Sequence, residues 1–204
     1  MTKRYKSINY TYILFVYPNM KNSFVRGFES WDSPSLIIKN QEIRLSSTPF
    51  AHQIPIYKDK ELVCCSYICD GYKNCYSDSG VLFESNTPII YVIPDDSRAF
   101  MRSGNWIPWY EKFLFKSVEE MLDKYPNPKY FQEDLKKLFE SLSPTDIYKN
   151  AEDKESAERL YRRDLFLFSN YTSWYNEIAF EHPVKIENPV IFNSKEKMID
   201  ILSK

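Results

Sequence analysis

Strand-like segments lie at both ends of this sequence, and a long helical stretch separates them. Runs of β-branched and aromatic residues bounded by Pro, Gly, Asn or Asp occur at 9–17, 24–28, 42–46, 53–57, 80–84 and 88–93. Similar runs return at 174–184 and 189–192. The order favours an α+β fold in which helices are inserted between strands. At 204 residues we expect one domain covering 1–204.

The helical signals are local and well marked. Ser33 followed by Pro34 is typical of a helix start, and Ser117 with Glu120 forms a capping box. We expect helices at 33–40, at 60–68, after Ser117, at 131–142, at 153–166 and after Ser194. The two central helices are amphipathic, so they pack against other elements.

Charge does not point to a polyanionic partner. Lys and Arg total 27 against 28 Asp and Glu, so a nucleic acid would have to meet a local basic patch. Arg159, Arg162 and Arg163 are the densest basic group. A solvated helix face is the preferred interpretation, and a phosphate-contacting rim is the alternative.

The opening residues and the cysteines indicate a cytoplasmic protein. The apolar run near the start is interrupted by polar residues, so we interpret it as a first strand and not as a signal peptide. No stretch is long enough to span a membrane. Without an export signal, we expect Cys64, Cys65, Cys69 and Cys75 to be reduced thiols. Their spacing does not fit a zinc site, so we expect no metal.

Gly27 is one of only four glycines, and it stands inside a predicted strand directly after Arg26. Glycine in a strand is best tolerated where a ligand or another backbone approaches closely. A guanidinium offers a planar fork of donors that suits phosphate or carboxylate. The pair therefore predicts a site for a ligand that carries a phosphate or an amide.

Two further segments carry polar groups. Ser46, Ser47 and Thr48 follow a predicted strand, where hydroxyls can bind a ribose or a carboxamide, although a polar turn explains them equally well. Glu177 lies inside an apolar strand, and alternation places it on the same face as Tyr175. In a cleft, such a carboxylate could stabilise developing positive charge.

The segments FVRG, IRLSST and YNEIAF resemble, in order, the signature segments of the ADP-ribosyltransferase superfamily. The resemblance implies split antiparallel β-sheets that form a nucleotide cleft, with NAD as cosubstrate. It assigns Glu177 and Arg26 as catalytic, with Glu177 on the ribose 2′-hydroxyl. The expected cofactor-binding residues are Arg26, Gly27, Ser46, Ser47, Tyr57 and Tyr175.

The middle of the chain is similar in order and texture to the DarT-type toxins, which modify DNA with NAD. The resemblance implies a mono-ADP-ribosyltransferase toxin or phage-defence effector, with a DNA or RNA acceptor and an antitoxin partner. In a DarT-like register the acid would be Asp164, but Glu177 fits the wider superfamily better. Tyr175 replaces the second acid of arginine-modifying members, which argues against an arginine acceptor. The alternative is a catalytically inactive binding protein, either an antitoxin or a phage-encoded inhibitor.

Overall fold

The computed structural model of the chain describes residues 23–28, 33–43, 54–96, 101–102, 105–106, 110–170 and 175–203. Its strands are β1 (Ser23–Gly27), β2 (Glu42–Ile43), β3 (Leu62–Ile68), β4 (Gly80–Glu84), β5 (Ile89–Ile93), β6 (Met101–Arg102), β7 (Asn105–Trp106), β8 (Glu177–Glu181), β9 (Val184–Lys185) and β10 (Glu187–Phe192). Its α-helices are α1 (Pro34–Asn40), α2 (Val118–Lys124), α3 (Pro128–Glu140), α4 (Pro144–Ile147), α5 (Lys154–Asn170) and α6 (Lys195–Leu202), and two 3₁₀ turns are η1 (Pro55–Tyr57) and η3 (Tyr110–Phe113).

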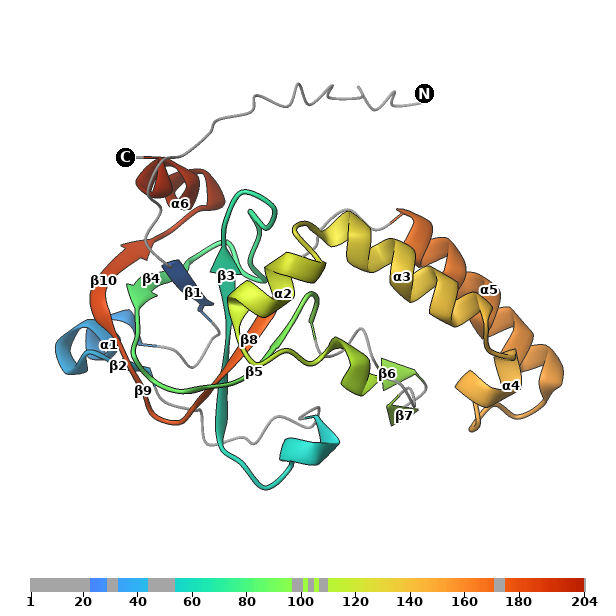
Figure 1. Cartoon of the computed structure of the whole chain (residues 1–204). Coiled ribbons are helices and arrows are strands. Elements are labelled where there is room, and N and C mark those ends of the chain that lie inside the picture. The colour runs from blue at the N-terminus through green and yellow to red at the C-terminus, as the bar shows by residue number, and fades with distance from the viewer. Residues whose placement is uncertain are drawn as a thin grey trace, which may run out of the picture.

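Six strands form one antiparallel sheet in the order β10-β4-β1-β3-β8-β5 (Figure 1). β8 and β10, from the end of the chain, pair with β3, β5 and β4 from its first half. Two-stranded sheets join β2 with β9 and β6 with β7. The expected α+β class is confirmed.

β3 is shared by the two halves of the large sheet. Its last residues pair with β1, from Val25↔Ser66 to Ser23↔Ile68, and its first residues, Leu62 to Cys65, pair with β8. The helix expected at 60–68 is therefore wrong. The segment is buried between two strands, and its β-branched and aromatic side chains suit a pleated surface better than a helix.

The two faces of the sheet are packed differently. On one face Phe24 meets Phe180 edge to face, with ring centroids 4.9 Å apart, and it also contacts Tyr67 and Phe83. On the other face, residues of β1, β3 and β4 form a smaller cluster with Met198 of α6. Because both faces are covered, the polar residues of the central strands lie in the interior.

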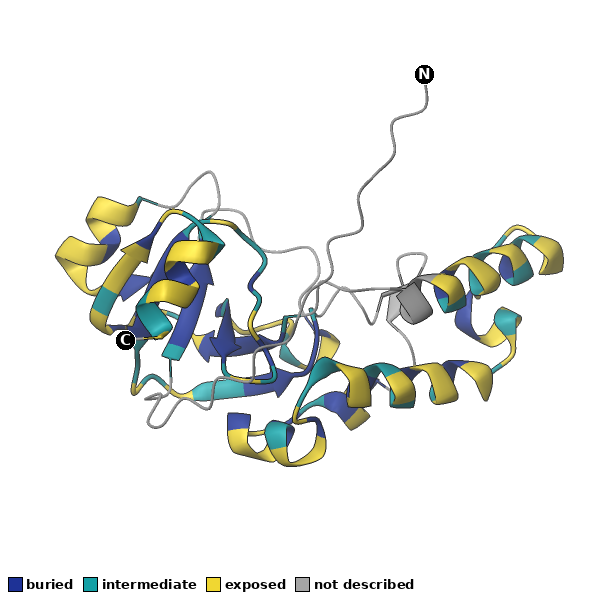
Figure 2. Cartoon of the chain, turned by 90° about the horizontal axis from the view of Figure 1, so that it is seen from above, coloured by how far each residue is buried: buried dark blue, intermediate teal, exposed yellow. Residues whose placement is uncertain are grey.

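α3 and α5 form an antiparallel pair that extends away from the sheet beyond β5 (Figures 1 and 2). The helical spacing predicted at 131–142 is confirmed, since Phe131, Leu135 and Phe139 are fully buried. Phe139 stacks on Tyr161 of α5 at 5.4 Å. The outer surfaces of both helices are exposed in Figure 2, as expected for amphipathic helices.

The helix starts expected after Ser33, Ser117 and Ser194 are confirmed, and the strand expected at 53–57 is not. Ser117 and Ser194 cap α2 and α6 by accepting main-chain N–H bonds, and α1 begins at Pro34. The strand expected at 53–57 is wrong over Pro55–Tyr57, which form η1, because proline fixes φ and cannot donate to a sheet. The strand expected at 9–17 lies outside the described residues. Among the described helices, none has the length and apolarity needed to cross a membrane.

Candidate functional site

The candidate site lies where β1 separates from β3. Pairing of β1 with β3 ends at Val25↔Ser66, while pairing with β4 continues to Gly27↔Gly80. The Arg26 side chain enters this separation, and its Nη1 donates to the carbonyl oxygen of Cys64 at 2.7 Å. Arg26 is only 5% exposed. The guanidinium thus takes a main-chain acceptor that a continued β1 ladder would have used.

Glu177 lies on the other side of β3. It is 6% exposed and is the first residue of β8, opposite Ile93 of β5. The Tyr91 hydroxyl donates to its Oε1 at 2.6 Å, and the same hydroxyl lies 4.0 Å from the Cys64 sulfur. Arg26, Cys64, Tyr91 and Glu177 therefore form one contiguous network, which we call the sheet network. It unites the two residues predicted to be catalytic.

Tyr57 joins the sheet network from η1. Its ring stacks on Tyr91 with centroids 5.4 Å apart and planes 12° from parallel. Tyr57 is half-buried, and Cys64 is the one half-buried member of the sheet network. The predicted cofactor-binding residue thus contacts the group that holds Glu177.

Tyr175 and Gly27 meet through a residue that sequence reasoning did not find, Tyr76. The Tyr76 ring lies 6.2 Å from the Tyr175 ring, its hydroxyl donates to the Gly27 carbonyl, and the Arg26 guanidinium lies 5.6 Å from its centroid. The Tyr175 hydroxyl in turn donates to Asp96. Tyr76 therefore connects Tyr175 with Arg26 and Gly27. Tyr57 reaches Glu177 through Tyr91, and Arg26 reaches Glu177 through Cys64 and Tyr91.

The reason for Gly27 is visible in its surroundings. A Cβ at this position would lie 2.7 Å from the Ser77 Cβ and 3.1 Å from the Tyr76 ring. The close approach inferred from the sequence is real, and the approaching group is another part of this chain. Ser46 and Ser47, in contrast, lie outside the described residues.

Asn176 is the second residue that sequence reasoning missed. It is fully buried, its Oδ1 accepts from Tyr67 N at 2.6 Å, and its Nδ2 donates to Tyr67 O at 2.9 Å. The side chain thereby replaces a strand partner just before β8 begins. Because Glu177 is the next residue, these two bonds fix the point from which its carboxylate projects.

Burial decides the protonation of the network. It raises the pKa of the Cys64 thiol well above its ordinary value, the nearby Glu177 raises it further, and Arg26 lowers it. Burial followed by Glu177 also raises the pKa of Tyr91 well above normal. Both groups stay protonated near neutral pH, so Tyr91 is a donor and Cys64 is no thiolate nucleophile.

The alternative acid, Asp164, belongs to the helical pair. It lies on α5, where the Tyr148 hydroxyl donates to it at 2.6 Å and Arg163 Nε donates at 2.9 Å. Both of these partners belong to the helical region, and α5 extends away from the strands that carry the sheet network (Figure 1).

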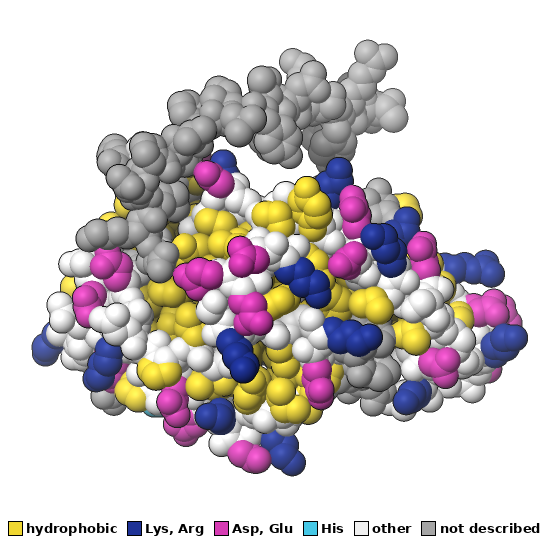
Figure 3. Space-filling model, viewed as in Figure 1, with side chains coloured by type: hydrophobic (Ala, Val, Ile, Leu, Met, Phe, Trp, Pro, Cys, Tyr) yellow, Lys and Arg dark blue, Asp and Glu magenta, His cyan; other side chains and the backbone are white. Residues whose placement is uncertain are grey.

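Charge on the helical region is mixed. Residues 118–170 contain 12 acidic and nine basic residues. Arg162 lies near Glu158, and Arg163 pairs with Asp164. Acidic and basic side chains also intermingle across the face in Figure 3. These observations favour a solvated helix face over a phosphate rim for the arginines of α5.

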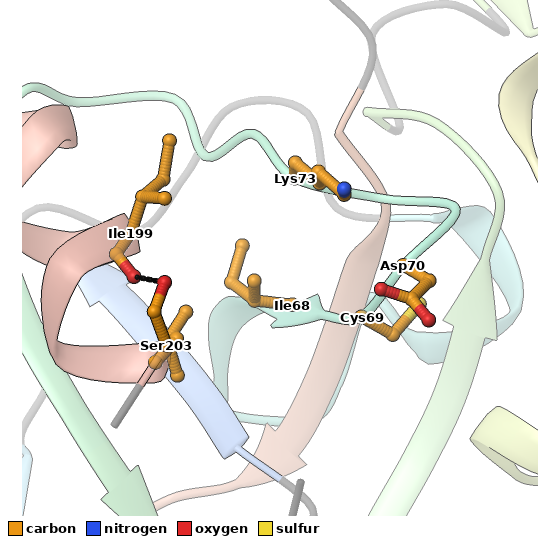
Figure 4. A pocket seen from close by; sticks show the side chains of 7 residues that line it. Ile68, Cys69, Asp70, Lys73, Ile199 and Ser203 are labelled. Carbon is orange, nitrogen blue, oxygen red and sulfur yellow. Dashed lines mark hydrogen bonds between the residues drawn. The ribbon is translucent and has the colours of Figure 1, made fainter. Parts of the chain in front are cut away.

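A pocket of about 50 Å³ lies away from the sheet network, between the end of β3 and α6 (Figure 4). Its walls come from Ile68, Cys69, Asp70, Lys73, Ile199, Leu202 and Ser203. It is smaller than the roughly 150 Å³ cavity that accepts benzene, so it does not mark a dinucleotide site. In the described part of the chain all four cysteines are free thiols, and no three His, Cys, Asp or Glu residues cluster as metal ligands would.

Comparison with known proteins gives no relative. The chain matches no protein-family model, and no curated protein or solved structure matches it significantly.

Proposed function

We propose that this chain is a mono-ADP-ribosyltransferase that uses NAD, with Glu177 and Arg26 at its centre. The observation that carries the proposal is the sheet network, in which Arg26 and Glu177 approach the same residue, Cys64, from opposite neighbours of β3. Burying a guanidinium or a carboxylate costs free energy unless hydrogen bonds or opposite charges compensate it, and functional sites are where such groups gather. We assign the nucleotide cleft of the proposed fold to the separation of β1 from β3, which the Arg26 side chain occupies in this structure.

In this reaction the bond between nicotinamide and ribose C1′ breaks, and the electron pair leaves with nicotinamide. The ribose becomes cation-like, and a nearby carboxylate stabilises that charge more in the transition state than in the ground state. Glu177 has this role, and Tyr91 holds one of its oxygens. An acceptor oxygen or nitrogen then attacks C1′ and releases its proton. Arg26 and Gly27 frame the nicotinamide end, with Tyr57 and Tyr175 near it, and the sequence resemblance assigns Ser46 and Ser47 to the same pocket.

The proposed acceptor is nucleic acid. We propose that the protein is a toxin or phage-defence effector that acts in the cytoplasm and has an antitoxin partner. The basis is Tyr175, which stands where arginine-modifying enzymes have an acid. The test is incubation of the protein with labelled NAD and with DNA, RNA or total protein. We expect label on nucleic acid with the parent protein and none with Glu177→Gln. Equal labelling by Glu177→Gln would rule out the assigned chemistry.

A binding protein that keeps the scaffold without the reaction is the second candidate. The hydrogen bonds from Tyr91 to Glu177 and from Tyr76 to Gly27 favour it, because internal groups already use the atoms assigned to the dinucleotide. A thermal-shift titration separates the candidates, since a ligand of the folded state raises its melting temperature. An unchanged melting temperature at millimolar NAD supports the binding protein.

A further inference from the structure

Tyr76 occupies a position with the features of a ring-binding site. It lies on the connection between β3 and β4 and is half-buried. Arg26 faces its ring at 5.6 Å, the Tyr175 ring lies at 6.2 Å, and its hydroxyl donates to the Gly27 carbonyl. Cation, aromatic neighbour and main-chain acceptor all act on one planar group.

Gly27 leaves a flat backbone surface for the Tyr76 ring to lie on. Because glycine has no side chain, the Tyr76 ring lies against the backbone of β1, and a Cβ would come within 3.1 Å of two of its ring carbons. A planar aromatic amide would find the same contacts, with its π face toward the guanidinium and its N–H on the Gly27 carbonyl.

We infer that the Tyr76 side chain occupies the position where the planar amide-bearing ring of the ligand binds, which we call the ring seat. The side chain leaves the ring seat when the ligand binds. The inference rests on the proposed function, which assigns the nicotinamide ring to the neighbourhood of Arg26 and Gly27. Only molecules in which Tyr76 has left the ring seat can bind the ligand ring. The apparent affinity for the ligand is therefore the intrinsic affinity multiplied by the fraction of such molecules.

The neighbours of Tyr76 are anchored, so only its side chain has to move. Ser77 Oγ donates to the Phe28 carbonyl at 3.2 Å, and the Cys75 thiol donates to the Ser77 carbonyl at 3.1 Å. The first bond ties the connection to the residue that follows β1, and the second spans Tyr76 within the connection. Rotation about the side-chain torsions of Tyr76 exposes the seat without unfolding the connection.

The experiment tests whether a small ligand restores the stability of Tyr76→Ala. Its melting temperature is measured with nicotinamide and, separately, with p-cresol, which mimics the missing side chain. We expect nicotinamide to raise the melting temperature of Tyr76→Ala by several degrees and to leave the parent protein unchanged. We also expect NAD to bind Tyr76→Ala about tenfold more tightly than the parent. Rescue by p-cresol alone would show that Tyr76 only fills space, and it would overturn the inference.

Tyr161 supplies the matched control. It is also half-buried, it stacks on Phe139, and its hydroxyl donates to a main-chain carbonyl, that of Phe139. Tyr161→Ala must not respond to nicotinamide, and an equal response would show nonspecific filling of a truncated site. If Tyr76→Ala does not fold, Tyr76→Leu answers the same question because it keeps apolar contacts and lacks the ring.

The two proposals fail in different ways. Transfer from NAD by the parent, with equal affinity in Tyr76→Ala, would overturn the role of Tyr76 and leave the proposed function standing. Rescue of Tyr76→Ala by nicotinamide, without transfer by either protein, would support the ring seat and remove the transferase activity. Absence of both would remove both.

Discussion

Two acids in this chain are buried to nearly the same extent and accept similar hydrogen bonds from tyrosine. Their partners differ in how far away they are in the sequence. Glu177 in the sheet and Asp164 in the helical pair are 6% and 5% exposed, and each accepts from a tyrosine hydroxyl at 2.6 Å. The partner of Asp164 is 16 residues away in sequence, and its arginine is the preceding residue. The tyrosine that holds Glu177 is 86 residues away, on another strand.

The difference indicates different roles. Asp164 ties α4 to α5 through Tyr148, and Arg163, whose side chain is 60% exposed, neutralises it from the solvent side. Glu177 instead lies among a guanidinium, a thiol and stacked tyrosines that come from four separate segments. The contacts of Asp164 join residues that are close in sequence. The contacts of Glu177 join residues from segments that are remote in sequence.

The sharpest test of this contrast is activity. Glu177→Gln, which keeps the shape and removes the charge, should lower transfer from NAD by about 100-fold or more, because the cation-like ribose loses its carboxylate. Labelled-NAD assays measure it. Asp164→Asn is the matched control and should stay within about twofold of the parent, since Asp164 stabilises helices and not a reaction. A loss of similar size in both variants would contradict the contrast.

The next effect is on stability at the start of β8. Asn176→Ala leaves the Tyr67 N–H and carbonyl buried without their side-chain partner, and it should lower the free energy of unfolding by about 3 kcal/mol. Denaturant titration measures this. Hydrogen exchange should show faster exchange at Tyr67 than in the parent.

Asn127 is the control for Asn176. It caps α3 at the surface by accepting from Lys129 N at 3.1 Å, so Asn127→Ala should cost only about 1 kcal/mol. An equal cost for the two substitutions would show that Asn176 does not hold β8.

Asp164→Ala should have a slightly smaller effect than Asn176→Ala. It removes the acceptor of the Tyr148 hydroxyl and should lower the free energy of unfolding by about 2 kcal/mol. The lost ion pair with Arg163 adds little to this cost, because solvent screens the exposed guanidinium. Proteolysis should then cut first in the α4–α5 region, while the sheet stays protected. Preferential cleavage near β8 would show that the two regions are not independent.

The smallest effect is on cysteine reactivity. Glu177 raises the pKa of Cys64, so Glu177→Gln lowers that pKa and increases the thiolate fraction at pH 8–9. Iodoacetamide should modify Cys64 a few times faster in Glu177→Gln, as site-resolved mass spectrometry would show. Cys69 is the internal control, because burial and Asp70 raise its pKa and Glu177 does not contribute. An unchanged rate at Cys64 would contradict the electrostatic coupling.

The helices could be predicted from sequence because their causes act over a few residues. Ser117, Ser194 and the apolar spacing of Phe131, Leu135 and Phe139 each describe a turn or a face of one helix. β3 could not, because its seven residues become a strand through burial between β1 and β8, whose residues are remote in sequence. η1 carries the apolar pattern of a strand, and only Pro55, which cannot donate to a sheet, signals otherwise.

The candidate site divides in the same way. The sequence resemblance predicts Arg26, Gly27, Tyr57, Tyr175 and Glu177 as site residues, and the fold connects all five through Cys64, Tyr76 and Tyr91. Tyr91, Cys64 and Asn176 carry no local signal, since each matters only through strand register. Tyr76 lies in a connection without regular structure, where no period exists to indicate which side chain turns inward.

By itself, the sequence determined where the helices after Ser33, Ser117 and Ser194 begin and which faces of the central helices are apolar, because caps and periodicity are properties of neighbouring residues. Only the tertiary structure decided that β3 joins the two halves of the large sheet, that Arg26 and Glu177 meet at Cys64, and that Tyr76 lies on Gly27. Register between distant strands sets these contacts, and register depends on the free energy of the whole packed sheet.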